Sequence, residues 1–262
     1  MTTPKPAFLG PVHGAAFQDR DVAIAYQARP PYPDEVFDVL GRVLVDEPRV
    51  VLDLGCGTGV IARQMAPMVE RIDAVDISAA MIAEGRQATG GDHPAIRWIV
   101  GRAEDAALDP PYALVVAASS LHWMDWDVVL PRLGQSLTPR GVLVIVGEGQ
   151  VPPPWQDALL TIIRKHSVNR AFRPGFDLPS ELAARGLLDL QGRCKTSPVP
   201  FRQPLDAYVE SFHARSGLTR AGLGRKRAEQ FDSEVRQLVS QHCGSDVELR
   251  LVSDVAWGRP AA

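Results

Sequence analysis

The sequence predicts an α/β protein, with a doubly wound, mostly parallel sheet of seven strands and a helical lid. Between residues 49 and 147, short apolar runs alternate with amphipathic segments, which is the pattern of successive βαβ units. A glycine cluster follows the first apolar run directly, as it does where a parallel strand meets a ligand-binding helix. After Gly147 the Pro-rich stretch EGQVPPPW ends this rhythm, so the remainder is expected to form the lid and the last strands.

The first 149 residues divide into an N-terminal segment and a core. Residues 1–48 predict two helices, at 15–28 and 34–44, joined by the turn RPPYP. Residues 49–149 predict the core, and Ser78 is suited to cap its second helix. The strands of this core are expected at RVVLDLG, RIDAVDIS, AIRWIVG, YALVVAA and GVLVIVG, with helices at 59–65, 79–87 and 127–137.

The second half of the chain predicts two helical insertions around two further strands. Residues 150–187 and 203–245 are expected to form a lid over the carboxyl end of the sheet. Residues 188–202 and 246–262 predict the last strands of the core, and VELRLVSDVAW alternates in a way that suits a sheet edge. The helices of the insertions are expected at about 155–170, 180–185, 205–215 and 224–242.

Composition narrows the classes of function. The chain has 262 residues, 45% hydrophobic and 23% charged, with a formal net charge of −3, so it has no general attraction for nucleic acid. Its three cysteines are scattered without CxxC spacing, and neither a disulfide framework nor a metal site is expected. The first twenty residues contain no apolar core of a signal peptide, and no run is long enough to cross a membrane. We therefore expect a cytoplasmic location.

The stretch VVLDLGCGTGV carries the chemistry of the core. Gly55, Gly57 and Gly59 lie between a strand and a helix, where a glycine backbone lets a ligand approach the helix N-terminus. A dinucleotide would require the spacing GxGxxG, whereas the glycines here are spaced GxGxG. Asp53 precedes the loop and would repel a pyrophosphate, but its carboxylate suits a cationic ligand with an amino group. S-adenosylmethionine is such a ligand.

The stretch 50–148 resembles the class I S-adenosylmethionine-dependent methyltransferases at four successive motifs. They are the glycine loop, DAVDIS, GRAEDAAL and SSLHW. The resemblance implies a Rossmann-like fold, S-adenosylmethionine as cofactor and S-adenosylhomocysteine as product. In such a site Asp76 would accept both ribose hydroxyls, and Asp105 would accept from the adenine amine. The other cofactor contacts that the resemblance implies are Asp53, Gly55, Cys56, Gly57, Ile77, Met81, Ala103, Glu104 and Ser119.

The segments AYQARPPYP and SSLHWMDW are similar to the small-molecule branch of that family, which includes the trans-aconitate methyltransferase-like enzymes. In that branch the N-terminal segment closes over the cofactor, with Tyr26 and Arg29 at its methionine end and Arg29 pairing the carboxylate. His122 would face the reacting centre, either as a base or as a residue that orders the pocket. Trp123 and Trp155 are the candidates for an apolar substrate wall.

Two other stretches invite a functional interpretation that their context does not favour. Residues 109–112 spell DPPY, which resembles the signature of methyltransferases that act on base amines. Those enzymes carry it after the fourth strand, whereas here it precedes the strand, so we interpret it as a turn. The basic stretch RAGLGRKR, residues 220–227, is interpreted as the solvated start of a helix.

The sequence therefore predicts transfer of a methyl group from S-adenosylmethionine to an O or N atom of a small molecule, such as a natural-product intermediate. One alternative is methylation of a nucleic acid or a protein, which would require a basic or peptide-sized groove. Another is a protein that binds S-adenosylmethionine without catalysis. We expect no nucleic-acid or membrane partner, and no motif in the lid identifies the acceptor or the oligomeric state.

Overall fold

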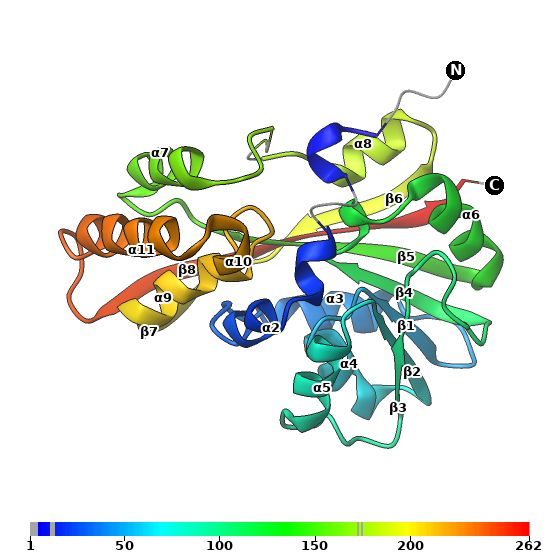
Figure 1. The fold of residues 1–262 in the computed structure, drawn as a ribbon. Helices are drawn as coiled ribbons and strands as arrows, with labels where there is room; N and C mark the ends of the chain where they lie inside the picture. The colour runs from blue at the N-terminus through cyan, green and yellow to red at the C-terminus, as the bar shows by residue number, and fades with distance from the viewer. Residues whose placement is uncertain (1–4, 11–13, 172, 174, 262) are drawn as a thin grey trace.

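The computed structural model describes residues 5–10, 14–171, 173 and 175–261, which form an eight-stranded sheet with helices on both faces (Figure 1). The strand order is β3-β2-β1-β4-β5-β8-β6, and β7 also pairs with β8. The strands are β1 (Val50–Leu54), β2 (Arg71–Asp76), β3 (Ile96–Val100), β4 (Tyr112–Ala118), β5 (Leu137–Gln150), β6 (Leu188–Lys195), β7 (Val199–Pro204) and β8 (Asp246–Pro260).

The helices follow the amphipathic segments of the sequence. Ser78 caps α5 as expected, because its hydroxyl accepts from the Met81 amide at 3.2 Å. The α-helices are α2 (Arg20–Tyr26), α3 (Glu35–Val43), α4 (Val60–Met65), α5 (Ala79–Gln87), α6 (Trp126–Ser136), α7 (Gln156–His166), α8 (Leu178–Ala184), α9 (Leu205–Ser211), α10 (Arg220–Leu223) and α11 (Arg225–Val239). Short 3₁₀ turns occur at η1 (Ala7–Leu9), η2 (Ala15–Gln18), η3 (Ala66–Met68), η4 (Leu121–Trp123) and η5 (Phe212–Ala214).

Strands β1 to β5 are parallel, and the expected doubly wound sheet is confirmed. From β1 the chain adds β2 and β3 on one side, and then returns to add β4 and β5 on the other. The strand order therefore reverses between β1 and β4. In an open α/β sheet this reversal leaves a crevice at the carboxyl ends of the two strands, and ligands bind there.

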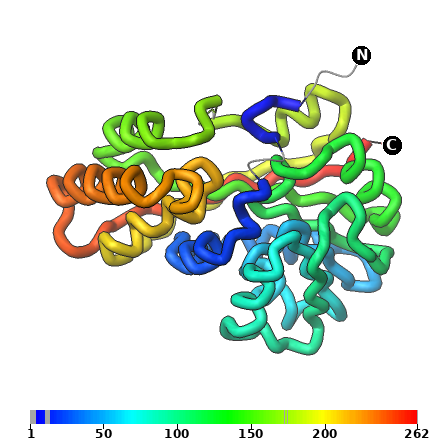
Figure 2. The backbone as a smooth tube through the Cα atoms, in the orientation of Figure 1, coloured from blue at the N-terminus to red at the C-terminus, as the bar shows by residue number. Residues whose placement is uncertain are grey.

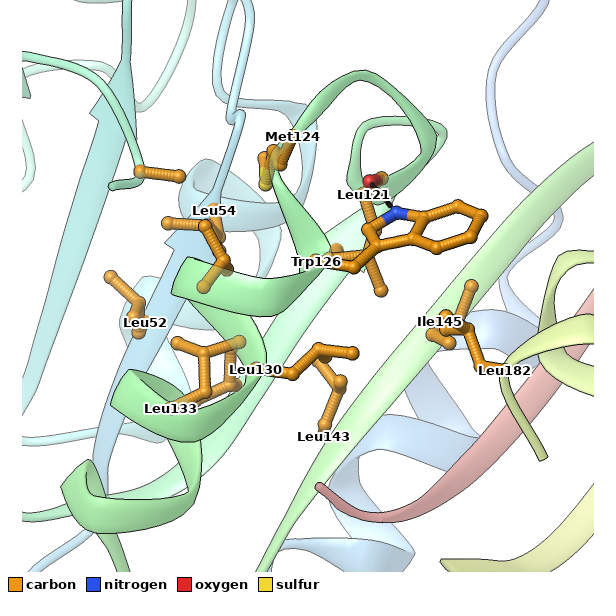
Figure 3. Close-up of a cluster of buried hydrophobic side chains, with 14 of the residues drawn as sticks. Leu52, Leu54, Leu121, Met124, Trp126, Leu130, Leu133, Leu143, Ile145 and Leu182 are labelled. Carbon is orange, nitrogen blue, oxygen red and sulfur yellow. Dashed lines mark hydrogen bonds between the residues drawn. The ribbon is translucent and has the colours of Figure 1, made fainter. Parts of the chain in front are cut away.

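The sheet buries a hydrophobic core on each face. Along β1, Leu52 and Leu54 pack with Leu130 and Leu133 of α6, as Figure 3 shows. Val51, which directly precedes Leu52 in sequence, packs in the opposite cluster with residues of α3 and α4. This alternation follows from the two-residue period of a strand. Because both faces are covered, β1 and β4 are buried along almost their whole length and mostly apolar, with Asp53 of β1 as an exception.

The sheet differs from the prediction in strand number and in the place of the last strand. Residues 188–204 form two strands rather than one, with a break at Thr196, whose hydroxyl accepts from the Ser253 amide at 2.8 Å. The 15-residue strand β8 is long enough to pair antiparallel with β6, β7 and β5. It is therefore an interior strand, and its prediction as an edge was wrong. Alternation of apolar and polar residues indicates which face of a strand is buried, but not whether the strand has a neighbouring strand on each side.

Helices α7, α9, α10 and α11 form an outer helical layer at one end of the molecule (Figures 1 and 2). This layer has its own apolar cluster, in which Phe231 and Tyr208 pack against Leu249 of β8. Helix α8 differs from the rest of residues 150–187, because its Leu182 lies in the main core beside α6. The N-terminal helix α2 packs against both α5 of the core and η5 of the outer layer. No helix among the described residues combines the length and the apolar character that crossing a membrane requires.

The stretch DPPY leads into β4, with Tyr112 as the first residue of that strand, and we predict that it has no role in turnover. The Tyr112 hydroxyl donates to Asp73 Oδ2 at 2.6 Å and accepts from the Asp109 amide at 2.9 Å. Tyr112→Phe should therefore destabilise the fold by about 1–2 kcal/mol through lost hydrogen bonds, and leave kcat within a few-fold. Asp109→Ala, which removes an exposed ion pair, should cost less than about 1 kcal/mol. Urea unfolding and turnover assays test this, and loss of turnover in a folded variant would contradict it.

Candidate functional site

The glycine loop after β1 packs tightly against the loop after β4 and also faces Tyr26. Gly55, Gly57 and Gly59 all have positive φ, between 55° and 72°, a region that favours glycine. A Cβ at Gly55 would lie 2.5 Å from Ser120 Cβ, so the loop after β1 contacts the loop after β4. A Cβ at Gly57 would face the Tyr26 ring at 3.7 Å, an ordinary contact distance. The loop is thus fixed against β4.

Two buried carboxylates flank this loop. Asp53 Oδ2 accepts from the Ala62 amide at 3.1 Å, while Asp53 Oδ1 is buried without a hydrogen-bond partner. Asp76 accepts from the Gly57 and Ser78 amides, at 2.8 and 2.7 Å. Burial, with a further contribution from Asp76, raises the pKa of Asp53 to about 7. Burial also raises the pKa of Asp76. This pair of acids is only partly satisfied by backbone donors.

The N-terminal segment brings Tyr26 and Arg29 to the same edge of the sheet. The Arg29 guanidinium lies 4.6 Å from the Tyr26 ring centroid and forms an ion pair with Glu148, near the end of β5. The two residues therefore lie together, and their place at the methionine end of the cofactor stays a prediction. Glu148 was not predicted, although its position directly after the apolar run GVLVIVG could have indicated it.

The loops after β2 and β3 hold the residues predicted around the adenine ring. Ile77 is 40% exposed, which is unusual for an isoleucine. In the loop after β3, Ala103 is buried and Asp105 is exposed. Glu104 accepts from the Asp125 amide at 2.9 Å, which ties this loop to the start of α6. Met81 is buried against α2, so it supports the wall of the site from behind.

A cavity of about 790 Å³ begins where β4 and β5 end. Ser119, His122 and Trp123 line it from the loop after β4, and Arg29 and Glu148 line it from the two segments beside it. The opposite wall comes mainly from η1, α7, the residues around α8 and the segment around η5, and includes Phe8, Leu159, Phe176, Phe212 and Arg215. The Asn169 side chain closes one side, because it donates to the Phe8 carbonyl at 3.1 Å.

His122 is the imidazole nearest in sequence to the end of β4. Burial, with smaller contributions from the cations Lys5 and Arg29, lowers the pKa of His122 to about 4. The ring lies 4.4 Å from the Trp123 ring. His122 is therefore neutral at neutral pH and only weakly basic.

Ser119 adopts a backbone conformation that is uncommon for residues other than glycine. Its φ is 51°, and its amide donates to the Val146 carbonyl at 2.8 Å. Its hydroxyl lies 3.4 Å from the hydroxyl of Tyr32. Such strain costs roughly 1–3 kcal/mol and tends to occur at functional sites. Tyr32 was missed as a site residue, although it belongs to the quoted segment AYQARPPYP.

Trp155 does not line the cavity, and its prediction as a substrate wall was wrong. It is buried in the apolar cluster of the outer helical layer, where its indole N–H donates to the Tyr208 hydroxyl at 3.2 Å. The prediction failed because proximity in sequence to the insertion does not fix the direction of a side chain. Arg215, in contrast, lines the cavity without any preceding sequence signal, since only the tertiary packing of η5 brings it there. Within the described parts of the chain, no group of three His, Cys, Asp or Glu residues could hold a metal ion.

An open α/β sheet with a glycine loop, two buried acids and a cavity at its reversal point has the architecture of the Rossmann-like folds. Residues 51–141 match a family described as "Methyltransferase domain". Over this stretch the chain resembles a methyltransferase domain, the class that the sequence motifs predicted.

Comparisons with known proteins agree on this domain. The chain is 32% identical over 117 residues to malonyl-[acyl-carrier protein] O-methyltransferase of Halalkalibacterium halodurans, covering 42% of this chain and 43% of that protein. It is 36% identical over 114 residues to trans-aconitate 2-methyltransferase of an Azoarcus species, covering 41% and 42%. The matches thus span less than half the length of these relatives.

Solved structures resemble the whole chain more closely in fold than in sequence. A protein described as a type II methyltransferase from Anaeromyxobacter dehalogenans has a TM-score of 0.62 and 25% identity, covering 89% of this chain and 97% of that one. An S-adenosylmethionine-dependent methyltransferase from Geobacter sulfurreducens, solved with S-adenosylhomocysteine, has a TM-score of 0.54 and 18% identity, covering 92% and 98%. The latter likeness concerns the fold.

The raised pKa of Asp53 predicts how the stability of the ligand-free protein depends on pH. The folded protein holds a proton on Asp53 up to about pH 7, whereas the unfolded chain releases it near 3.8. Stability should therefore fall as the pH rises through this window. Between pH 5 and pH 8, the free energy of unfolding of the wild type should fall by about 1–3 kcal/mol relative to Asp53→Asn. Urea unfolding at both pH values measures this.

The control for this prediction is Asp105→Asn, the same change at an exposed carboxylate. It should leave the pH dependence of the wild type unchanged. Equal slopes for Asp53→Asn and the wild type would show that Asp53 is ionised in the folded protein over the whole range.

Proposed function

We propose that the protein transfers a methyl group from S-adenosylmethionine to an O or N atom of a small molecule bound in the cavity. One observation carries the proposal. The glycine loop, with its two acids that lack some hydrogen-bond partners, and one wall of the cavity come from the ends of the adjacent strands β1 and β4. These two parts touch where Gly55 meets Ser120. A cofactor held by the first would therefore present its reactive end to the second.

The residues around the glycine loop fit S-adenosylmethionine. Asp53 Oδ1, a buried acceptor without a partner, suits the N–H groups of an amino substituent. Each oxygen of Asp76 accepts one amide, which leaves capacity for two ribose hydroxyls. Exposed Ile77 offers an apolar surface for a base. When bound, the cofactor supplies an electrophilic methyl group on a sulfonium centre.

The residues of this chain would mainly position the reactants and exclude water. Arg29, stacked on Tyr26, is placed to pair with a carboxylate, a role that Glu148 fills in the ligand-free protein. The contact of η5 with α2, and that of Asn169 with Phe8, would keep the cavity closed while the methyl group moves. The outer helical layer would then act as the lid.

His122 would bind the acceptor as a neutral imidazole rather than remove its proton. A base whose pKa is near 4 is too weak to deprotonate a hydroxyl or an ammonium group effectively. A hydrogen bond from or to a neutral ring can still orient an acceptor oxygen or nitrogen. This role is compatible with the names of both relatives, which are an O-methyltransferase and a methyltransferase of trans-aconitate.

The alternative functions are less well supported by the geometry. A macromolecular substrate would need an open groove, whereas the hydrogen bond from Asn169 to the Phe8 carbonyl closes one side of this cavity. The basic stretch 220–227 borders a separate hollow of about 480 Å³, which shares no lining residue with the cavity. A binding protein without catalysis would keep the cofactor contacts but show no turnover with any acceptor.

The test has two stages. Calorimetry with S-adenosylmethionine and NAD should show binding of the first and not of the second, because an acid beside the loop disfavours a pyrophosphate. Release of S-adenosylhomocysteine, followed by mass spectrometry across a library of small hydroxy, carboxy and amino compounds, then measures transfer. Binding of NAD instead would exclude the proposal. Binding of S-adenosylmethionine without turnover on small molecules would favour one of the alternatives.

Asp76→Ala should weaken S-adenosylmethionine binding by about 1–3 kcal/mol, or roughly 5- to 150-fold in Kd, because hydrogen bonds to a charged group are lost. Calorimetry measures the change, and circular dichroism checks the fold. Asp92→Ala, which removes an exposed acid in the α5–β3 loop, is the control and should bind as the wild type does. Unchanged affinity in Asp76→Ala would mean that Asp76 does not hold the ribose.

His122→Ala should lower kcat/KM about tenfold, the equivalent of one hydrogen bond. Since the wild-type imidazole is neutral above about pH 4, both proteins should show the same pH dependence between pH 6 and 8. His242→Ala, at an exposed histidine outside the cavity, is the control. A loss of 10²–10⁴-fold, with disappearance of a rising limb of the pH profile, would instead identify His122 as a general base.

A further inference from the structure

The cavity carries a charge opposite in sign to that of the whole chain. Its lining includes five cationic side chains, Arg29, Arg173, Arg193, Lys195 and Arg215, and three acids, Glu148, Asp177 and Asp254. Two positive charges are therefore in excess, in a protein whose formal net charge is −3. A concave site lined by one sign of charge concentrates ligands of the other sign.

Two of these five cations already have carboxylate partners. Arg29 pairs with Glu148, and Arg193 lies 2.6 Å from Asp177 and 3.7 Å from Asp254. These pairs account for all three acids of the cavity. Across the described residues, no carboxylate lies within ion-pair distance of Arg215, Lys195 or Arg173. The excess charge of the cavity therefore belongs to these three side chains.

Arg215 is the one of the three that lies beside the proposed reacting centre. Its electrostatic neighbours include Arg29 and Glu148, which flank the end of the cofactor site. Burial and the charge of Arg29 both disfavour the guanidinium, and they lower the pKa of Arg215. An anion bound here would relieve both effects.

The backbone around Arg215 is held in place, so the side chain is positioned before a ligand binds. The Arg215 amide donates to the Phe212 carbonyl at 3.1 Å, and its carbonyl accepts from the Leu218 amide at 2.9 Å. The guanidinium lies 5.1 Å from the Phe212 ring centroid. Next to this turn, the ring nitrogens of buried His213 contact the Leu218 carbonyl at 2.8 Å and Asp232 Oδ1 at 2.7 Å. Such a fixed cation loses little side-chain entropy when it binds.

We propose that Arg215 is the specificity-determining residue of the acceptor site, and that it binds an oxyanion of the acceptor, a carboxylate or a phosphate. The planar guanidinium can donate two parallel hydrogen bonds to either group. The inference rests on the proposed function only in calling the ligand an acceptor, because binding of the anion is measurable without turnover.

The experiment measures binding of small probes by calorimetry to the full chain, with and without S-adenosylhomocysteine. Glutarate is compared with its neutral diamide, glutaramide, and glycerol 2-phosphate is compared with glycerol. The variants are Arg215→Gln, which removes the charge, and Arg215→Lys, which keeps it. Arg225→Gln is the matched control, since it makes the same change at a side chain that is 94% exposed and lies outside the cavity.

The wild type should bind at least one oxyanion about tenfold or more tightly than its neutral counterpart, as expected for hydrogen bonds to a charged group. Arg215→Gln should abolish this preference, Arg215→Lys should keep part of it, and Arg225→Gln should keep all of it. S-adenosylhomocysteine should bind equally to all four proteins. A preference for glutarate identifies a carboxylate as the bound group, and a preference for glycerol 2-phosphate identifies a phosphate.

Three results would overturn the inference: no preference in the wild type, a preference that survives in Arg215→Gln, or an equal loss in Arg225→Gln. These results are separate from a failure of the proposed function. A protein that prefers anions through Arg215 but never transfers a methyl group would contradict the function alone. Turnover restricted to uncharged acceptors, unaffected by Arg215→Gln, would contradict the inference alone.

Discussion

The contact between Gly55 and Ser120 is the constraint on which the site depends. It joins the loop after β1 to the loop after β4, where the strand order reverses. The Ser120 hydroxyl also donates to the Leu54 carbonyl at 2.5 Å, so the end of β1 is tied to the same loop. Because Gly55 has no side chain, the two loops approach each other closely. A ligand held by the loop after β1 would therefore lie directly beside the cavity that the loop after β4 lines. The glycine thus sets the spacing between the two halves of the proposed reaction.

The buried acids of β1 and β2 differ in whether a cationic side chain pairs with them. Asp73 is fully buried and forms ion pairs with Arg97 at 2.7 Å and Arg71 at 3.3 Å. It also accepts a hydrogen bond from the Tyr112 hydroxyl at 2.6 Å. Asp53 and Asp76, at the carboxyl ends of the same two strands, receive only backbone amides. A buried carboxylate without a cation is costly, and such groups gather where a ligand supplies the missing donors. The unpaired acids are therefore the candidates for ligand contacts, whereas the paired acid is linked to its neighbours within the sheet.

The sequence was sufficient for the features that depend on local pattern. The five parallel strands, the cap at Ser78 and the place of DPPY before β4 follow from hydrophobic period, capping chemistry and order along the chain. The features that depend on long-range packing could not be predicted from the sequence. The local sequence does not show whether β8 is an interior or an edge strand. It also does not show that Trp155 packs in the outer helical layer or that Arg215 lines the cavity. The roles of the individual site residues stay predictions, because similarity of fold does not determine chemistry.

Strand β8 also limits how the molecule can move. Its first residues pair with β7 beneath the outer helical layer, and its last residues pair with β5 and β6 within the core. A single unbroken ladder therefore runs from one part of the molecule into the other, and a hinge between them would have to break its hydrogen bonds. The outer layer and the core should consequently move as one rigid unit. Any gate through which reactants enter and leave must then lie in the segments that pack on this unit from outside, above all α2, which packs against η5 and α5.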